Sequence, residues 1–294
     1  MEQFFNKNYK KILIIPILLL AISVFIIFNH YKNTGDIINK DVSLKGGLSV
    51  EIYTKDPIEK ALFDSLEQKL GENFPEGNFL IRKTAELSAS LQNGIIIESS
   101  SVKEPVLKSF LEKTLAIKLD DDKNYFARET SSSLGESFYK QMLYTILIAF
   151  LFMAITVFII YRKFVPSLAI ISSPILNMIN TVAVIDLLGF TVSEATIAAL
   201  LLMIGYSVDT DILLTTKVLK MKEGSVFQRM KDSFRTGITM TIATITALVL
   251  ATLVSKSLVL REMFIVLIIG LLSDVISTYL MNTSMLKWYL KNEN

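Results

Sequence analysis

The sequence predicts an α-helical membrane protein with six transmembrane helices and one α+β domain between helices 1 and 2. The chain is 51% hydrophobic and has a mean hydropathy of +0.48, which is too apolar for an ordinary soluble domain. A helix that spans a membrane needs about 20 mostly apolar residues. Six stretches meet this requirement, at residues 11–29, 138–161, 166–188, 195–217, 236–254 and 262–286.

The first apolar stretch, "KILIIPILLLAISVFIIF", is suitable either as a signal peptide or as a membrane anchor. The sequence after it, "NHYKNTGD", contains no small-x-small cleavage site. We therefore expect residues 1–29 to contain a cytoplasmic N-terminus and an uncleaved first transmembrane helix. The other five stretches form a transmembrane bundle over residues 138–294.

The basic residues predict how the chain is oriented, because loops rich in lysine and arginine stay in the cytoplasm. The 189–194 loop contains no basic residue, and the 255–261 loop contains only Lys256 and Arg261. The basic residues of the other loops and of the ends are Lys7, Lys10, Lys11, Arg162, Lys163, Lys217, Lys220, Lys222, Arg229, Lys231, Arg235, Lys287 and Lys291. We expect both termini in the cytoplasm, residues 30–137 outside, and the chain in the cell membrane.

The composition excludes several kinds of site. There is no cysteine, and so no disulfide, thiol nucleophile or cysteine-bound metal. His30 is the one histidine, and we interpret it as solvated at the membrane interface. No G-x-x-x-x-G-K-[ST] phosphate loop is present, and a net charge of +2 indicates no nucleic-acid partner. We expect a protein that is not an enzyme and needs neither a cofactor nor a metal.

The segment of residues 30–137 has the pattern of a separate α+β domain. Period-two alternation in "GLSVEIYT" predicts a strand, and "PIEKALFDSLEQKLG" has the apolar spacing and end signals of a helix. Two strands, a second amphipathic helix and a last strand follow, at "NFLIRKT", "NGIIIESS", "EPVLKSFLEKTLAIKL" and "NYFARETSS". The order βαββαβ is typical of a ferredoxin-like split βαβ sandwich. Acids, bases and metal ligands do not cluster in it, which favours a binding or mechanical role.

The cytoplasmic loop of residues 218–235 has amphipathic spacing. One face would carry the apolar side chains of Val226, Phe227, Met230 and Phe234. The opposite face would carry Lys222, Arg229 and Lys231. This pattern predicts a short helix on the inner membrane surface, with docking of a partner as the alternative.

The fourth apolar stretch contains two aspartates, Asp209 and Asp211, in "MIGYSVDTDILLTTK". A rise of 1.5 Å per residue places them about 12 Å and about 9 Å from its inner end. A charge near the bilayer centre costs about 2.5–3.5 kcal/mol, so such residues face protein or water. There a carboxyl group can take up and release protons. The alternative is that both aspartates are structural contacts between helices.

The two aspartates point in opposite directions, because two residues on a helix are about 200° apart. Asp209 shares its face with Gly205 and Thr216, and Asp211 shares its face with Ser207 and Thr215. One aspartate can therefore face this bundle and the other a partner subunit.

Further polar residues lie within the predicted spans. Asp274 lies on a stripe at four-residue spacing with Gly270, Thr278 and Asn282, and we expect it to be functional. Asn177 and Asn180 have two possible roles, a functional one and a structural contact between helices. Ser173, Thr181 and the threonines of the fifth span are expected to hold helices together. The side chain of Arg235 either extends to the membrane–water interface or reaches inward to Asp211 or Asp209.

Several motifs together resemble the SecF family, the accessory subunits of the Sec protein-export machinery. "GYSVDTDILLTTK", "SFRTGITMT" and "IGLLSDVISTYLMN" resemble its fourth to sixth spans, and "VDTD" resembles its archaeal branch. "DVSLKGGLSVEI" is similar to its Asp-plus-Gly-Gly signature, and "YRKFVPS" fits a turn of the family. The resemblance covers nearly the whole chain.

The resemblance implies a member of the proton-driven RND superfamily that pairs with SecD. The bacterial SecF pattern reads Asn-Asp-Thr where this chain reads Asp209-Thr210-Asp211, so the bacterial aspartate falls on Thr210. The aspartate of the SecD pattern, Gly-x-x-x-Asp, falls on Asp209. This match ranks Asp209 first and Asp211 second as candidate proton carriers. Arg235 matches an arginine of the family, and the short outside domain favours SecF over SecD.

The predicted function is therefore SecF-like promotion of protein export with SecD, beside the Sec channel, driven by the proton motive force. Protons would pass Asp209, Asp211 and Asp274, tuned by Arg235, and a Gly46-Gly47 hinge would move the outside domain against exported chains. The supporting polar residues would be Asn177, Asn180, Thr278 and Asn282. The alternatives are an RND-type exporter of lipids or small molecules, an extracytoplasmic folding aid, and a scaffold whose carboxylates do not titrate.

Overall fold

The computed structural model describes most of the chain. Lys7, Lys10, Lys222 and Lys256, which entered the topology prediction, and the first residues of the expected first domain helix lie outside the described residues. The described residues are 9, 11–54, 60–75, 77, 79–84, 93–121, 123–221, 223–255 and 257–293.

The chain divides into two compact units, which we call the helical unit and the α+β unit. The α+β unit consists of Lys40–Leu143 and Val192–Glu194. The helical unit consists of Met1–Asn39, Tyr144–Thr191 and Ala195–Asn294.

Within the described residues, six helices are long and apolar enough to cross a membrane, and each contains most of one predicted span. The last crossing, Val259–Lys291, is interrupted by a π-helical segment. The helices are α2 (Ile14–Thr34), α6 (Ser132–Tyr161), α7 (Phe164–Leu187), α8 (Glu194–Lys220), α9 (Val226–Val254), α10 (Leu258–Ile276), the π-helix η1 (Ser277–Asn282) and α11 (Thr283–Glu293).

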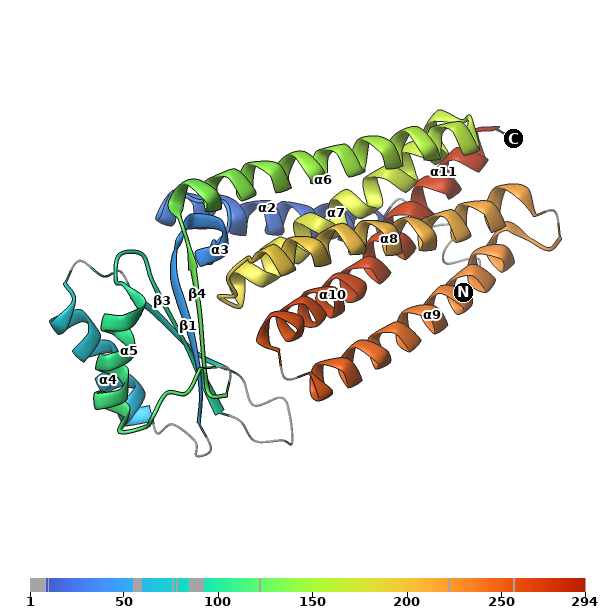
Figure 1. Ribbon diagram of the computed structural model, residues 1–294. Coiled ribbons are helices and arrows are strands. Elements are labelled where there is room, and N and C mark those ends of the chain that lie inside the picture. Colours follow the sequence, from blue (N-terminus) through green and yellow to red (C-terminus); the bar gives the residue numbers. More distant parts are fainter. Residues whose placement is uncertain are drawn as a thin grey trace. The chain divides into compact units, whose positions relative to one another are not determined.

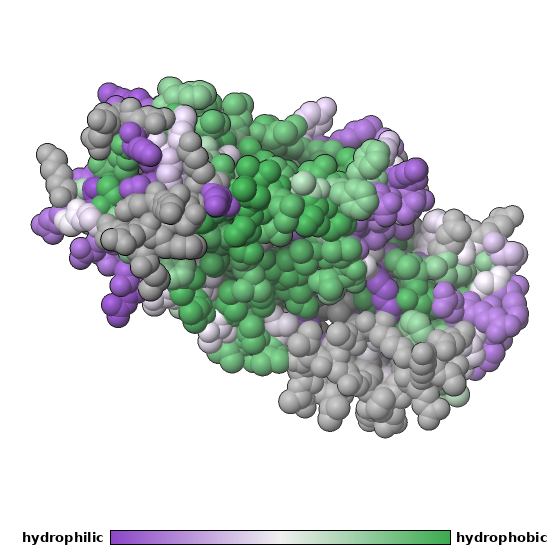
Figure 2. Space-filling model, turned by 180° about the vertical axis from the view of Figure 1, so that it is seen from behind, coloured by the Kyte–Doolittle hydropathy of each residue, from purple (hydrophilic) through white to green (hydrophobic). Residues whose placement is uncertain are grey.

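The helical unit has a largely apolar exterior. Figure 2 shows hydrophobic residues covering most of its visible surface. Soluble monomers rarely expose contiguous apolar patches larger than a few hundred Å², so this surface fits contact with lipid or other membrane helices. The most exposed apolar side chains include Phe25, Leu147, Phe152, Phe164, Leu187 and Val254.

The prediction of a separate surface helix before the fifth span is wrong. The hydroxyl of Ser225 accepts a hydrogen bond from the amide of Gln228 at 3.2 Å, and from there α9 is continuous. No proline interrupts it near residue 235. Its apolar side chains Val226 and Met230 pack on α8 and α11, at Leu214, Val218 and Leu286. The amphipathic spacing therefore serves packing within the bundle. It does not form the expected separate helix in the plane of the membrane surface.

The α+β unit has the predicted element order. Its strands form a sheet of order β2-β3-β1-β4 in the described residues, and every neighbouring pair is antiparallel. The elements are β1 (Gly47–Thr54), α4 (Lys60–Asn73), β2 (Phe79–Thr84), β3 (Asn93–Ser99), α5 (Glu104–Leu115) and β4 (Tyr125–Thr130).

One face of this sheet is buried under the two helices (Figure 1). Alternate residues of β1 point into the core, as the period-two pattern predicts. They pack with side chains of β3, α4 and α5. The buried members include Val50, Ile52, Ile95, Ile97, Leu66, Leu70, Leu107 and Leu111.

We expect residues 40–137 to fold without the rest of the chain, because this core lies within them. The excised segment should melt cooperatively by circular dichroism. Ile97→Ala, at a fully buried position, should lower its free energy of unfolding by about 2–5 kcal/mol. Leu80→Ala, at a side chain that is 41% exposed, should change it by about 0.5 kcal/mol or less. A broad, non-cooperative melt of the unmutated segment would refute independent folding.

Candidate functional site

The helical unit contains a buried polar cluster centred on two carboxyl groups. Asp211 of α8 has no exposed surface, and Asp274 of α10 is 2% exposed. The charge of Asp274 acts on Asp211. The helix α7 supplies buried polar side chains beside them, because it packs on α10, η1 and α11. The cluster therefore joins three membrane crossings, namely α7, α8 and the last crossing.

Asp274 is held by three side chains. The hydroxyl of Ser207 donates a hydrogen bond to its Oδ1. The Nδ2 of Asn177 donates to the same oxygen at 3.4 Å, and the hydroxyl of Thr278 lies 3.5 Å from it. Ser173 and Thr278 lie 3.5 Å apart through their hydroxyl groups, which extends the network to α7.

Asp211 is held by the last crossing. The Nδ2 of Asn282 donates a hydrogen bond of 2.8 Å to its Oδ1. Asn282 ends the π-helical segment η1, in which the amide of Thr283 bonds to the carbonyl of Thr278, five residues earlier. Such π-helical turns occur often at functional sites. Here the turn places Asn282 against α8.

The two faces of α8 differ as the spacing predicts. Ser207, Asp211 and Thr215 are buried, whereas Gly205 and Asp209 are exposed. Asp209, the first-ranked carrier, therefore lies outside the polar cluster, and Asp211 lies within it. The rotation of α8 about its axis, set by packing, decides which carboxylate is enclosed.

The remaining predicted residues divide between the cluster and other places. Asn180 is buried but accepts a hydrogen bond of 2.9 Å from Ser23 of α2, away from both aspartates. Arg235 is exposed on α9. In the part of the chain that the structure describes, no ion pair joins a basic side chain to Asp211 or Asp274. Among the described residues, the two buried carboxyl groups therefore have hydrogen-bond donors around them but no partner cation.

The prediction of a solvated His30 is wrong. Its Nδ1 lies 2.9 Å from Oδ1 of Asp186 in α7, and the two side chains are only 14% and 5% exposed. The physical reason is that α2 continues to Thr34 and packs along α7, so His30 lies within the helix contact. Sequence reasoning named Ser207 only as a residue on the same helix face as Asp211, and it missed Ser23, a hydroxyl within an apolar stretch.

The Gly46-Gly47 pair lies at a tight junction within the α+β unit. Both glycines have positive φ, +84° and +127°, which other residues rarely adopt. A Cβ on Gly46 would collide with the backbone of Ser132, at the start of α6. Asp41, before the pair, caps the short helix α3 (Val42–Lys45) by accepting a 2.8 Å bond from the amide of Ser43. The family-like motif "DVSLKGG" thus encodes a capped helix followed by two conformationally special glycines.

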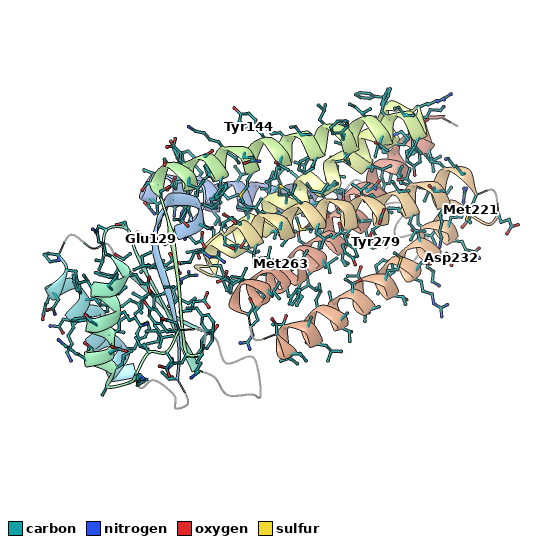
Figure 3. All side chains as sticks on the ribbon, viewed as in Figure 1. Glu129, Tyr144, Met221, Asp232, Met263 and Tyr279 are labelled. Carbon is teal, nitrogen blue, oxygen red and sulfur yellow. The ribbon has the colours of Figure 1, made fainter. Side chains whose placement is uncertain are left out.

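Tyr279 of η1 connects the last crossing to α9 (Figure 3). Its ring packs edge-on against Phe234, with centroids 4.8 Å apart, and its hydroxyl donates to the carbonyl of Ser233 at 3.4 Å. The hydroxyl occupies the space beside Gly237, where a Cβ would collide with it. α9 and η1 therefore lie close together at Tyr279, the residue that follows Thr278 of the buried polar cluster.

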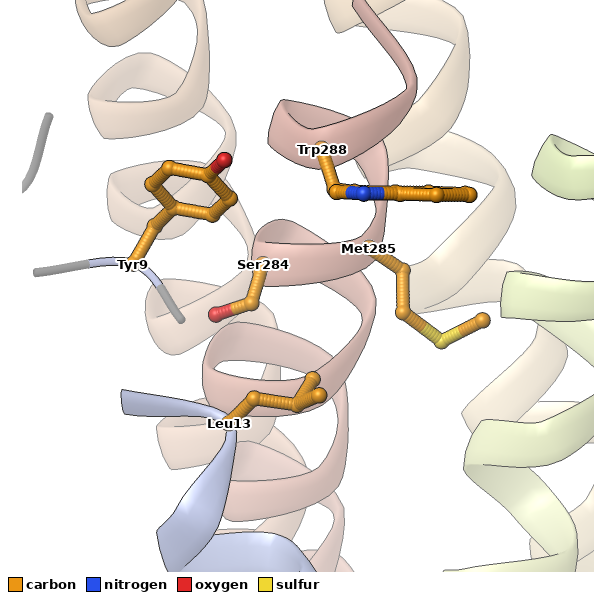
Figure 4. Close-up of a pocket in the computed structure, with 5 residues that line it drawn as sticks. All are labelled: Tyr9, Leu13, Ser284, Met285 and Trp288. Atoms are coloured by element: carbon orange, nitrogen blue, oxygen red, sulfur yellow. The ribbon is translucent and has the colours of Figure 1, made fainter. Parts of the chain in front are cut away.

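A separate cavity of about 320 Å³ lies between the start of the first crossing and α11 (Figure 4). Its walls are mainly apolar, and neither aspartate lines it. The lining residues are Tyr9, Leu13, Ser284, Met285 and Trp288. It contains none of the predicted site residues.

Comparison with known proteins places the chain in a family. The family described as "Protein export membrane protein SecD/SecF, C-terminal" matches residues 111–292. Protein-export membrane protein SecF of Methanothermobacter thermautotrophicus is 35% identical over 291 residues, 97% of this chain and 94% of that protein. SecF of Methanolacinia petrolearia is 32% identical over 287 residues, 96% of this chain and 94% of that protein.

A solved structure supports the fold over the whole length. The crystal structure of SecDF, a translocon-associated membrane protein from Thermus thermophilus, aligns with a TM-score of 0.78 at 17% identity. The alignment covers 98% of this chain and 38% of that longer one. With a family match over most of the chain and full-length relatives above 30% identity, the chain belongs to the SecF family of protein-export membrane proteins.

Proposed function

We propose that this subunit uses the proton motive force in protein export, with Asp211 and Asp274 as the proton-binding pair. It would act in complex with a SecD-type chain beside the Sec channel, on exported polypeptides. The observation that supports this most is the enclosure of two interacting carboxyl groups, 0% and 2% exposed, without a compensating cation in the described residues.

Such a pair is suited to binding a proton. Two negative charges close together in a low-dielectric interior repel each other, so one carboxyl group holds a proton readily. A proton crossing a potential of about 100 mV gains about 2.3 kcal/mol. This energy is enough to bias a two-state element, because an energy of about 1.4 kcal/mol changes an equilibrium tenfold.

Proton binding would also change the contacts that join the helices. An ionised Asp211 only accepts hydrogen bonds, whereas a protonated one also donates. The donor facing it, Asn282, ends a π-helical segment, a kind of turn that occurs often at functional sites. Protonation of Asp211 would therefore be transmitted to the last crossing.

Asp209 has a different proposed role. It lies on the exposed side of α8 with Gly205, where a partner helix can approach closely over the glycine. We assign this side to the SecD-type partner, so that Asp209 and the exposed Arg235 contribute to the assembled complex. Co-purification with a SecD-type chain, and its loss in Gly205→Leu, tests this assignment.

The placement of the α+β unit is part of the proposal. Its strand order and antiparallel pairing support a ferredoxin-like fold. We propose three domains: residues 1–29 as N-terminus and anchor, 30–137 outside, and 138–294 as the bundle with cytoplasmic loop 218–235. The Gly46-Gly47 junction would transmit movement of α6, whose first turn it contacts.

The topology can be tested directly, because the chain has no natural cysteine. Single cysteines introduced at Ser100 and at Glu293 should differ in reaction with a membrane-impermeant maleimide. Intact cells should label the first position and not the second, and permeabilised cells should label both. The reverse pattern in intact cells would overturn the proposed orientation.

The proposed coupling predicts that a protonophore lowers the rate of export supported by this subunit. Export of a secreted reporter is measured in cells with and without the subunit, at equal energy charge. The subunit should raise export only while the proton gradient is present. An equal gain with and without protonophore would favour a scaffold or a folding aid over a proton-coupled subunit.

A further inference from the structure

We propose that His30 and Asp186 form a second proton-binding site, which passes protons to the Asp211 and Asp274 pair. This inference rests on the proposed proton coupling and adds the site at which protons would enter the helical unit. His30 lies near the end of α2 and Asp186 near the end of α7. At this end of α2 the chain leaves the bundle for the α+β unit, which the proposed topology places outside.

The geometry is that of an enclosed acid–base pair. The imidazole Nδ1 lies 2.9 Å from the Asp186 carboxylate, and both side chains are largely buried. The second ring nitrogen, Nε2, is buried and has no hydrogen-bond partner among the described residues. An imidazole with a carboxylate beside one nitrogen and no hydrogen-bond partner at the other is suited to accept and release a proton.

Few other charges reach this pair. Of the elements packed on α7, namely α2, α10, η1 and α11, only α2 brings a charged group to Asp186 in the described part of the chain, and that group is His30. Lys32, two residues further along α2, is exposed. The protonation of His30 therefore decides whether Asp186 has a positive partner.

Buried polar side chains wind around α7 from this pair towards Asp274, in a stripe that turns by about 60° for every three residues. Asn177, Asn180, Ala183 and Asp186 follow one another at three-residue spacing and are all largely buried. Asn180 is hydrogen-bonded to Ser23 of α2 at 2.9 Å, and Asn177 donates to Asp274 at 3.4 Å. About 9 Å of helix separates Asp186 from Asn180, and the small Ala183 occupies this interval.

The stripe also accounts for residues that the two-aspartate cluster leaves without a role. Asn180 and Ser23 are buried polar groups away from Asp211 and Asp274. Buried polar groups within a membrane bundle are costly, and they mark ion pathways. A proton route along the α2–α7 contact assigns both of them to one path.

The test separates proton binding from simple hydrogen bonding. The amide pair His30→Gln with Asp186→Asn retains polar side chains of similar size but cannot bind a proton. The exchanged pair His30→Asp with Asp186→His retains one imidazole and one carboxylate. Lys32→Gln, which removes an exposed charge from the same turn, is the control. Export of a secreted reporter is measured with and without protonophore, at matched levels of the membrane complex.

We expect loss of the protonophore-sensitive part of export in the amide pair, and its retention in the exchanged pair and in Lys32→Gln. Wild-type behaviour of the amide pair, with coupling lost in Asp274→Asn, would overturn the second site but leave the proposed function intact. Unchanged coupling in Asp274→Asn and Asp211→Asn would instead overturn the proposed function.

A second measurement does not depend on export. His30 is the one histidine of the chain, so labelling with ¹⁵N-histidine gives the ring nitrogens of a single residue. In the purified full-length protein, the ¹⁵N shifts of the ring should change as the pH is varied, and Asp186→Asn should alter that change. Ring shifts that do not respond to pH would refute proton binding, also where both double variants assemble poorly.

Discussion

Asp211→Asn and Asp274→Asn are each expected to reduce export to the level that remains in the presence of a protonophore. The new amide is close to the size of the carboxyl group and can still accept the hydrogen bonds from Asn282 or Ser207. It cannot bind a proton or carry a charge. The variants should therefore reach the membrane and assemble normally, because polar contacts between membrane helices contribute only about 0.6 kcal/mol on average.

Asp209→Asn is the matched control, because it makes the same chemical change two residues away on the exposed side of α8. We expect it to retain coupling more fully than Asp211→Asn, with its main effect on association with the SecD-type partner. Export is compared at equal amounts of complex, with and without protonophore. A reversed order, with coupling lost in Asp209→Asn and kept in both other variants, would assign proton transport to the partner-facing side.

Gly237→Ala is expected to destabilise the helical unit by about 1–3 kcal/mol, the usual cost of overpacking. In an ordinary helix position the same change would stabilise by about 1 kcal/mol, because alanine is the better helix former. Here the added methyl group would collide with the hydroxyl of Tyr279. Tyr279 would have to leave its contacts with Phe234 and Ser233, which would separate α9 from η1.

Gly205→Ala provides the comparison, because a Cβ at Gly205 meets no atom within 4 Å. In the isolated chain it should leave the melting temperature unchanged or raise it slightly. Thermal unfolding of both variants in detergent gives the difference directly. Equal melting temperatures for the two alanine variants would show that Tyr279 moves aside without loss, and that the close approach of α9 and η1 does not stabilise the bundle.

The local patterns of the sequence were enough to predict the elements and their order. Apolar stretches of about 20 residues identify membrane helices because the bilayer demands that length. Alternation in β1 and helical spacing around Leu107 and Leu111 identify the sheet and one covering helix, because burial follows the period of each element. The same spacing correctly separated the face of Asp211 from that of Asp209.

Tertiary packing decided which of those faces is enclosed. Spacing along α8 gives the angle between Asp209 and Asp211, but the rotation of the helix is set by its neighbours, and it encloses Asp211. Asn282 reaches Asp211 from a π-helical segment that contact with other helices shapes.

Long-range contacts account for the other differences between sequence and structure. His30 and Asp186 are separated by more than 150 positions, and no local pattern relates them. Residues 226–235 are amphipathic in either setting, on a membrane surface or against α8 and α11. The local sequence shows which of these side chains are apolar and which are charged. The residues that each one contacts depend on which helices the fold brings together.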